Sequence, residues 1–131
     1  PVEELRALHQ KVLRAHREGK VELLMEDEAP DYVVANRGEI TRPSLAERRS
    51  RFGAYFGTTA FSEYRDLVDP VITASADGTL GWVVVQVTAK GVQTSADGAQ
   101  EPLQFVSAWI ELYQKRAGRW FITRWSMRYD K

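Results

Sequence analysis

The chain has 131 residues and carries 18 Lys and Arg against 18 Asp and Glu, so its formal net charge is zero. With 44% hydrophobic and 27% charged residues, the composition is that of a folded globular domain and excludes a disordered chain. A neutral balance also disfavours a dedicated nucleic-acid binder and a polybasic membrane-surface protein. Because there is no cysteine, disulfides, thiol nucleophiles and zinc–thiolate sites are excluded.

No segment of the sequence is long and apolar enough to cross a membrane, since the longest strongly apolar run is WVVV at residues 82–85 and a spanning helix needs ~20 residues. The N-terminal segment PVEELRALHQKVLRAH is charged throughout and lacks the apolar core of a signal peptide. No repeat or linker divides the chain. We therefore expect a single domain over residues 1–131, a cytoplasmic location and no membrane partner.

The first helix is predicted over residues 2–17, where apolar residues recur every three or four positions. Gly19 is placed to end it, because glycine accepts the left-handed conformation common after a helix. A second short helix is predicted over residues 21–25, with Pro30 closing it off. The next segment, DYVVAN at residues 31–36, is typical of a short strand.

A third helix is expected to begin after Ser44. The segment Ser44-Leu45-Ala46-Glu47 fits a capping box, in which the Ser hydroxyl and the Glu carboxylate each satisfy a free N–H of the first turn. This helix is predicted to run to about Phe56 and to end at Gly57. Its expected inward side chains are Leu45, Phe52 and Tyr55 or Phe56.

The second half of the chain is predicted to form strands. Residues 62–74, 80–92, 103–115 and 119–129 are rich in β-branched and aromatic side chains. Asp-Gly at residues 77–78 and Ala-Gly at residues 117–118 predict hairpin turns, and Asp-Gly at residues 97–98 predicts a longer loop. Helices first and a long antiparallel sheet afterwards predict an α+β fold with the helices stacked on one sheet face.

Both faces of this sheet carry large apolar groups. Ile110 and Leu112 alternate with Trp109 and Tyr113, whereas a sheet with one wet face should alternate apolar and polar residues. The helices cover one face, so we expect a second copy of the chain to cover the other in a homodimer. Burial in a larger assembly is the alternative.

The order of these elements, together with AHREGK at residues 15–20 and GRW at residues 118–120, resembles the nuclear transport factor 2-like superfamily. Within it, the chain is most similar to the SnoaL-like or ketosteroid-isomerase-like group of small bacterial proteins. Many relatives have Gly-Asp after the first helix, where this chain has Lys20. The resemblance implies a curved antiparallel sheet wrapped by N-terminal helices around a conical pocket, with dimerisation through the sheet. Fold alone assigns no activity.

The resemblance also identifies which isomerase groups to look for. Ketosteroid isomerases of this kind use a tyrosine, a carboxylic acid and a general-base aspartate, whose positions here fall at about Val12, Ile110 and Asn36. None of these three residues can supply that chemistry, although a shift of one residue would bring in Glu111. The Asp-Arg-Asp arrangement of limonene epoxide hydrolases is not evident either, with Asp66, Arg124 and Glu111 as scattered candidates.

Two histidines lie on the first predicted helix. His9 and His16 are seven residues apart, which at ~1.5 Å per residue separates their backbones by about 10.5 Å and argues against a shared metal site. We expect no metal and no cofactor. His16 is a catalytic candidate because imidazole titrates near neutrality. Alternatively it is a structural histidine that bonds a backbone carbonyl or solvent near the Gly19 turn.

Two strands supply the other polar candidates. Tyr32 and Asn36 share a face of the first strand and could orient a ligand, although Asn36 could instead serve the turn that follows it. Arg124 shares a face of the last strand with Trp120, Ile122 and Ser126, where a buried charge demands an anionic ligand or a carboxylate such as Glu111 or Asp66. The expected catalytic residues are His16, Tyr32 and Arg124. The expected ligand contacts are His9, Asn36, Tyr55, Trp82, Trp109, Glu111, Trp120 and Ser126.

The charges are unevenly spread along the chain. Between Glu22 and Asp31 there are five acids and no base, and between Lys115 and Lys131 there are six bases against one acid. We therefore expect opposed acidic and basic patches, with the basic hairpin bringing Arg124 to the pocket. Arg48, Arg49 and Arg51, in RPSLAERRSRF at residues 42–52, are expected on a solvated helix face rather than on a nucleic-acid site.

Three functional hypotheses follow. The first is a pocket for a small, apolar molecule with a carbonyl or anionic group, with weak isomerase-, cyclase- or hydrolase-like acid–base chemistry as a further option. The second is a non-catalytic homodimeric association module with a vestigial cavity. The third and least favoured is an accessory domain that binds nucleic acid. Aromatic lining favours a flat ligand. The sequence leaves open whether the protein is an enzyme.

Overall fold

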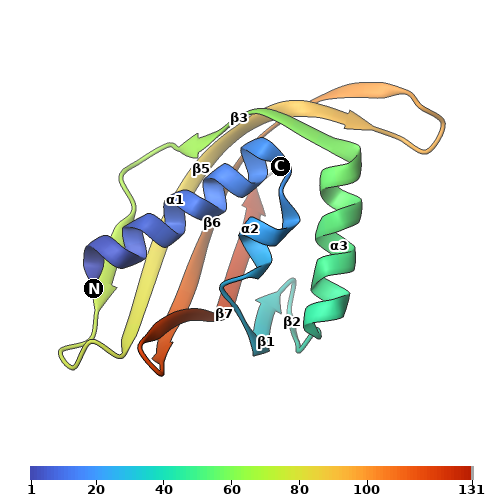
Figure 1. Cartoon of the computed structure of the whole chain (residues 1–131). Helices are drawn as coiled ribbons and strands as arrows, with labels where there is room; N and C mark the ends of the chain where they lie inside the picture. Colours follow the sequence, from blue (N-terminus) through green and yellow to red (C-terminus); the bar gives the residue numbers. More distant parts are fainter. Residues whose placement is uncertain (131) are drawn as a thin grey trace.

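Over residues 1–130, which the computed structural model describes, three helices lie in front of one face of a seven-stranded curved sheet (Figure 1). Residues 124–130 are described by their backbone alone. The sheet order is β2-β1-β7-β6-β5-β3, with β4 paired to β5. The elements are α1 (Val2–Glu18), α2 (Val21–Met25), β1 (Glu28–Asn36), β2 (Glu39–Thr41), α3 (Leu45–Thr58), β3 (Thr59–Asp66), β4 (Val71–Ala74), β5 (Leu80–Thr94), β6 (Gln100–Arg116) and β7 (Arg119–Asp130).

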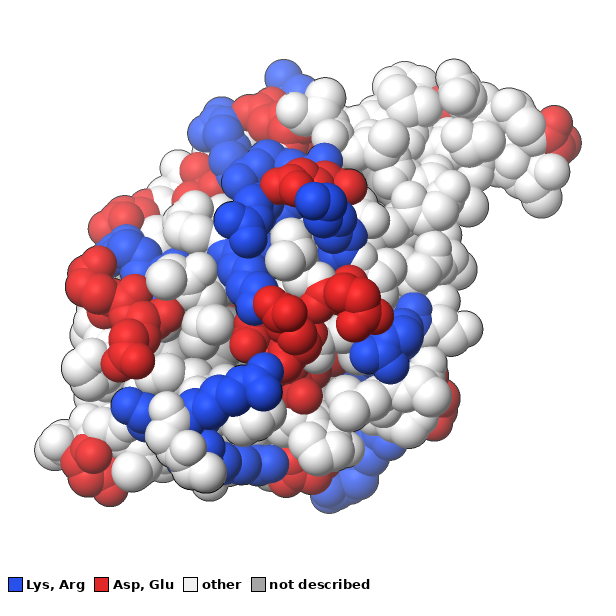
Figure 2. Space-filling model, viewed as in Figure 1, with Lys and Arg blue, Asp and Glu red and all other residues white. Residues whose placement is uncertain are grey.

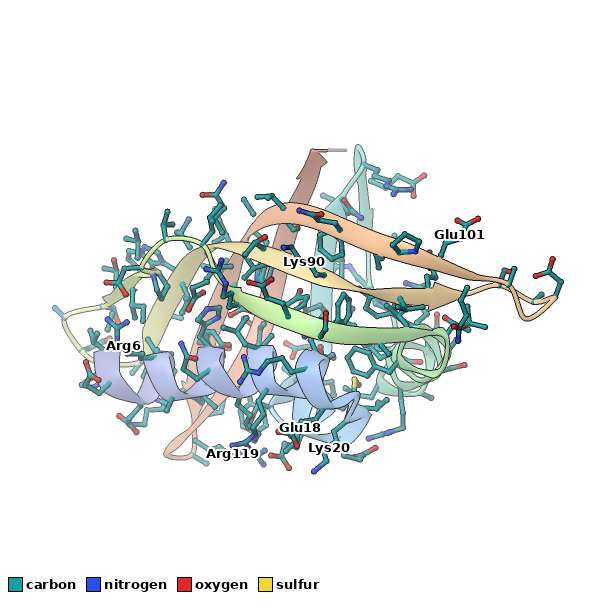
Figure 3. All side chains as sticks on the ribbon, turned by 90° about the horizontal axis from the view of Figure 1, so that it is seen from above. Arg6, Glu18, Lys20, Lys90, Glu101 and Arg119 are labelled. Carbon is teal, nitrogen blue, oxygen red and sulfur yellow. The ribbon has the colours of Figure 1, made fainter. Side chains whose placement is uncertain are left out.

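Helix α1 confirms the predicted amphipathic pattern. It ends at Gly19, whose φ of 64° is the left-handed conformation expected of a glycine cap. Leu5, His9 and Leu13 are buried against the sheet. A Cβ added at Gly81 of β5 would stand 2.4 Å from Leu5, so the helix lies very close to this strand. Figure 3 shows α1 along one side of the sheet, with Glu18 and Lys20 pointing away from it.

Helix α3 begins with the predicted capping box. The Glu47 N–H donates to the Ser44 hydroxyl at 3.1 Å, and the Ser44 N–H donates to the Glu47 carboxylate at 3.4 Å. The helix continues through Gly57 to Thr58, beyond its predicted end. Gly57 does not stop the helix because a glycine lowers helix stability without preventing helical φ and ψ angles.

The predicted strands and turns correspond closely to the structure. Gly78, Gly98 and Gly118 all have positive φ at their turns. The expected strand at residues 62–74 is instead two strands, β3 and β4. A bend at residues 67–70 separates them, and Pro70 at its end has no N–H to donate to a ladder.

The sheet is mixed rather than wholly antiparallel. β1 pairs with β7 in parallel, and every other strand pair is antiparallel over the described residues 1–130. A parallel pair needs a long connection between its two strands, and here the connection is the chain from β2 to β6, including α3. The fold nevertheless has the predicted α+β architecture, with an open curved sheet.

A bulge changes the parity of β7. Opposite β6, Tyr113 pairs with Ile122 but Leu112 pairs with Arg124, so Thr123 is the extra residue. Residues on the two sides of a bulge alternate out of phase. Arg124 and Ser126, which were predicted to share a face with Trp120 and Ile122, come after this bulge, and their side chains lie outside the described residues.

The two faces of β5 have different surroundings. Val83, Val85 and Val87 are buried under the helices, whereas Trp82 and Val84 are each 38% exposed on the opposite face. The far end of the β5–β6 hairpin extends beyond the other strands (Figure 1). In the described part of the chain, the helices lack an apolar stretch long enough for membrane spanning.

Candidate functional site

A cavity of about 280 Å³ lies between the helices and the concave face of the sheet. Most of its wall is apolar or aromatic, with a small number of polar groups, which is the usual make-up of a small-molecule site. The lining residues are Leu8, Val12, His16, Leu23, Leu24, Asp27, Glu28, Tyr32, Arg48, Arg51, Phe52, Tyr55, Tyr64, Phe105, Ser107, Trp109, Glu111, Tyr113 and Ile122.

Aromatic rings from three parts of the chain meet around His16. Its imidazole stacks on Tyr64, with ring centroids 4.1 Å apart and planes 11° apart. Phe56 meets it edge-on at 5.3 Å. These contacts fix the imidazole plane in the cavity wall.

His16 is held as a neutral imidazole. Its Nδ1–H donates to the carbonyl of Val12 at 2.8 Å, one helical turn earlier. Burial lowers the pKa of His16 from 6.5 to about 4, and the hydrogen bond to the Val12 carbonyl opposes this shift only in part. With Nδ1 as the donor, the lone pair of the neutral ring is on Nε2. The sequence analysis gave two alternatives for His16, a position in the pocket and a structural bond to a backbone carbonyl. The structure has both.

Glu111 is the most deeply buried carboxyl group of the wall, at 2% exposure. The indole N–H of Trp109 donates to its Oε1 at 2.8 Å, and the Tyr113 hydroxyl donates to its Oε2 at 3.0 Å. Desolvation raises the pKa of Glu111, while His9 and these two hydrogen bonds act in the opposite direction. The sequence analysis placed the carboxylic-acid position at about Ile110 and considered a shift of one residue to Glu111. The structure has this shift, because Glu111 and not Ile110 faces the helices.

An ion pair that the sequence analysis missed crosses another part of the wall. Arg48 of α3 donates from Nε and Nη2 to the two carboxylate oxygens of Glu28, at 2.7 and 2.6 Å. The guanidinium lies 4.1 Å from the ring centroid of Tyr32. Arg48 is 8% exposed, so the expectation that it lies on a solvated helix face is wrong. Its burial is possible because Glu28 and Tyr32 replace the lost water.

The helical spacing held a signal for this pair. Arg48 is three residues after Leu45 and four before Phe52, so it falls on the stripe predicted to face inward. Glu28 gave no comparable signal, since it falls between the predicted second helix and the strand predicted at residues 31–36.

The structure divides the predicted site residues into three groups. His16, Tyr32, Tyr55, Trp109 and Glu111 line the cavity. The side chains of Arg124 and Ser126 lie outside the described residues. The remaining four, His9, Asn36, Trp82 and Trp120, do not line it.

Those four have other positions. His9 is fully buried, and its Nε2 lies 2.6 Å from Oδ1 of Asp66. Asn36 ends β1 beside the turn to β2. Trp82 lies on the outer face of the sheet. Its orientation could not be predicted, because the run WVVV is apolar on both faces and does not show which residues point inward. Trp120 is buried, with the Lys115 ammonium 5.5 Å from its ring centroid.

The acidic and basic segments are interleaved rather than opposed. Asp31 binds Arg116 through two hydrogen bonds of 2.9 Å. Asp27, in the cavity wall, lies 2.8 Å from the Lys11 ammonium and 3.5 Å from Arg119. Figure 2 shows acidic and basic side chains side by side on this face. Among the described side chains, the expected separation into two patches is therefore wrong, because Arg116 and Arg119 of the basic hairpin pair with acids of the acidic segment.

No cluster of three potential metal ligands occurs among the residues with described side chains. His9 and His16 face different surroundings, one bound to Asp66 and the other in the aromatic wall.

Solved structures with the same architecture were found over almost the whole chain. An NTF2-like protein from Cytophaga hutchinsonii has a TM-score of 0.75 and 17% identity, covering 98% of this chain and 97% of that one. A ketosteroid isomerase-like protein from Erwinia carotovora atroseptica has a TM-score of 0.70 and 20% identity, covering 99% and 96%. This chain has the NTF2-like fold.

A third protein of NTF2-like architecture, from Xanthomonas campestris, is described as a putative calcium/calmodulin dependent protein kinase II association domain. It has a TM-score of 0.70 and 17% identity, covering 97% of this chain and 86% of that one. No family model matches the sequence, and no curated protein does. At these identities, the likeness extends to the NTF2-like fold and not to an activity.

Of the three isomerase positions compared above, only Val12, at the tyrosine position, lies in the cavity, together with Glu111 beside the position at Ile110. Asn36, at the general-base position, lies outside it. The cavity therefore holds a buried acid but has an aliphatic side chain where a phenol would be needed.

Proposed function

We propose that the protein binds a small, flat and mostly apolar molecule in the cavity between its helices and its sheet. The observation that carries this proposal is an unfilled space of about 280 Å³ with an aromatic wall and buried polar groups. Ligand pockets of drug-sized molecules start at about 300 Å³, so the volume suits a molecule of about two fused rings.

Weak acid–base chemistry at this site is a second part of the proposal. His16 offers a lone pair on a neutral imidazole, and Glu111 offers a carboxyl whose pKa is raised by burial. A base and an acid in one cavity are the groups that proton transfer on a bound ligand needs. Tyr32 supports binding more than proton transfer, because burial raises its pKa well above 10.

A thermal-shift screen tests the binding. Small bicyclic aromatic compounds should raise the melting temperature of the protein, since a ligand that binds only the folded state stabilises it. In a Val12→Phe variant the larger side chain fills part of the cavity, and the shifts should disappear. The control is Val68→Phe, at a residue 53% exposed in the bend after β3, which should respond like the original protein. If no compound shifts the melting temperature, or if Val12→Phe still responds, the proposed function is wrong.

A second candidate function is association. The outer face of the sheet carries exposed apolar side chains on adjacent strands, with Trp82 beside Leu112 and Val84 beside Ile110. Contiguous apolar surface of this kind marks interaction sites. We propose that a second copy of the chain packs here, since a two-fold axis would bring the same apolar patch of both copies together and bury it from water. The NTF2-like neighbour described as an association domain supports this candidate.

A further inference from the structure

We propose that the ligand of the cavity is a small aromatic amine, whose ammonium group pairs with the carboxylate of Glu111. This inference rests on the proposed function and names the ligand class of the same site. It follows from asking, for each carboxylate of the cavity wall, which cation of the protein neutralises it.

Two of the three carboxylates in the wall already have cations. Glu28 is bound through both oxygens to Arg48. Asp27 contacts the Lys11 ammonium at 2.8 Å, with Arg119 at 3.5 Å. Each of these acids is therefore neutralised by a side chain of the protein itself.

Glu111 is the exception. Its two hydrogen bonds come from neutral donors, Trp109 and Tyr113, and it has no ion pair with a Lys or Arg among the residues whose side chains are described. His9 attracts it, but that imidazole is bound to Asp66, whose own charge repels Glu111. Burying a carboxylate without a cation is costly, and a cation supplied by the ligand would remove that cost.

The aromatic wall can hold a cation. The guanidinium of Arg48 already lies 4.1 Å from the ring centroid of Tyr32 and 5.0 Å from that of Phe52, so rings of this cavity accept positive charge on their faces. His16 adds no opposing charge near neutral pH, because burial lowers its pKa to about 4. An ammonium at Glu111 would therefore meet a carboxyl group in a cavity whose rings already accept one cation and whose imidazole is neutral.

The same charges disfavour an anionic ligand. Of the arginines in the wall, Arg48 is occupied by Glu28, and Arg51 is exposed, so that water screens its charge far more than that of the buried Glu111. An anion placed beside Glu111 would oppose the ionisation of this carboxyl group, which burial already disfavours, whereas a cation would favour it. The described cavity thus favours a cation over the anionic group expected from the sequence.

Three matched probes test the ligand class at neutral pH. 2-Naphthylmethylamine, 2-naphthalenemethanol and 2-naphthoic acid share one ring system and differ in charge. Isothermal titration should give the amine about tenfold or more higher affinity than the alcohol, since a hydrogen bond to a charged group stabilises a complex more than a neutral one does. The acid should bind weakest. If none of the three binds, the proposed function fails; if the alcohol or the acid binds at least as tightly as the amine, only the ligand class is wrong.

Variants assign the preference to Glu111. Glu111→Gln keeps the shape of the side chain and an oxygen for Trp109, and should abolish the advantage of the amine over the alcohol. The control is Asp31→Asn, which removes a carboxylate outside the cavity and should keep the advantage. An advantage that survives Glu111→Gln overturns the assignment.

A measurement on the unchanged protein covers the case in which Glu111→Gln does not fold. Because burial raises the pKa of Glu111, an arriving ammonium should displace its proton. The affinity of the amine should rise as the pH is raised above the ordinary pKa of a Glu carboxyl, and titrations in buffers of different ionisation enthalpy should show proton release. Binding of the alcohol should show neither effect. Amine binding without proton release and without this pH dependence would also overturn the inference.

Discussion

His16 combines a structural and a chemical role in one side chain. Its Nδ1–H is used by the Val12 carbonyl and its ring face by Tyr64, which leaves only the Nε2 side of the ring for a ligand. This arrangement depends on the ring being neutral. A protonated imidazole would be a buried cation with no carboxylate bound to it.

The lowered pKa of His16 predicts a loss of stability in mild acid. Below about pH 6.5 the unfolded chain takes up a proton that the folded protein takes up only near pH 4, so the free energy of unfolding falls as the pH is lowered through this window. The full shift corresponds to about 3 kcal/mol. Urea unfolding from pH 7 to pH 4 should show this loss, and a His16→Phe variant, which keeps an aromatic ring on Tyr64, should lack it.

The comparison with His16→Phe isolates this residue. Glu111 contributes the opposite dependence, since its raised pKa makes the folded state less stable as the pH rises, but it does so in both proteins. Equal acid sensitivity of the two proteins would contradict the role given to His16.

Side-chain positions could be predicted in part. His16 and Tyr32 were placed correctly because each belongs to a regular helix or strand with one clear inward side. Glu28 and Arg48 were missed because the stability of a buried ion pair depends on a contact between residues 20 positions apart, which spacing does not report. The position of Glu111 could not be fixed, because a shift of one residue in the alignment of the strand moves a side chain from the cavity to the outer face.

Helix α3 forms one wall of the cavity and is attached to the sheet by a buried pair. Arg48 reaches from the helix to Glu28 at the start of β1. On the exposed side, Arg49 reaches Glu22 of α2 at 2.8 Å. These two pairs differ in burial but join the same helix to the same part of the chain, so they form a natural comparison.

Breaking the buried pair should be far more costly than breaking the exposed one. Glu28→Gln leaves Arg48 charged and buried without a carboxylate, and should lower the free energy of unfolding by about 3 kcal/mol or more. Glu22→Gln should change it by less than about 1 kcal/mol, because that pair is screened by water. Urea unfolding of both variants measures the difference. Similar losses would mean that Glu28 does not hold α3 in place.

The helices and turns were predictable, whereas the pairing of the strands was not. The cap at Ser44 and the end of α1 at Gly19 depend on interactions within a few residues, which the sequence displays directly. The position of Trp82 and the bulge at Thr123 depend on which strand lies alongside, so the local pattern misled in both places.

At the scale of the whole molecule, the sheet has one covered face and one open face. The helices and the cavity occupy the concave face. On the other face, Trp82 and Val84 of β5 lie beside Leu112 and Ile110 of β6. These four side chains are between 38% and 42% exposed, which is consistent with a surface covered in an assembly.

A charge placed at the centre of this surface should prevent the proposed homodimer. Ile110→Lys introduces a cation into an apolar interface and should shift the sedimentation of the protein at micromolar concentration to the 14.9 kDa species. The control is Leu67→Lys, at an exposed residue in the bend after β3, which should sediment like the original protein. The proposal is refuted if the original protein already sediments as the single 14.9 kDa species.

The parallel pairing of β1 with β7 has a consequence for biosynthesis. A ribosome completes α1, α2, β1 and α3 long before β7, the strand that β1 needs as its neighbour. Until then, the edge of β1 that pairs with β7 has no partner, and an unpaired strand edge is a surface on which nascent chains aggregate. The cavity, with its floor on β6 and its closing strand synthesised later still, is therefore the last part of the protein to take shape.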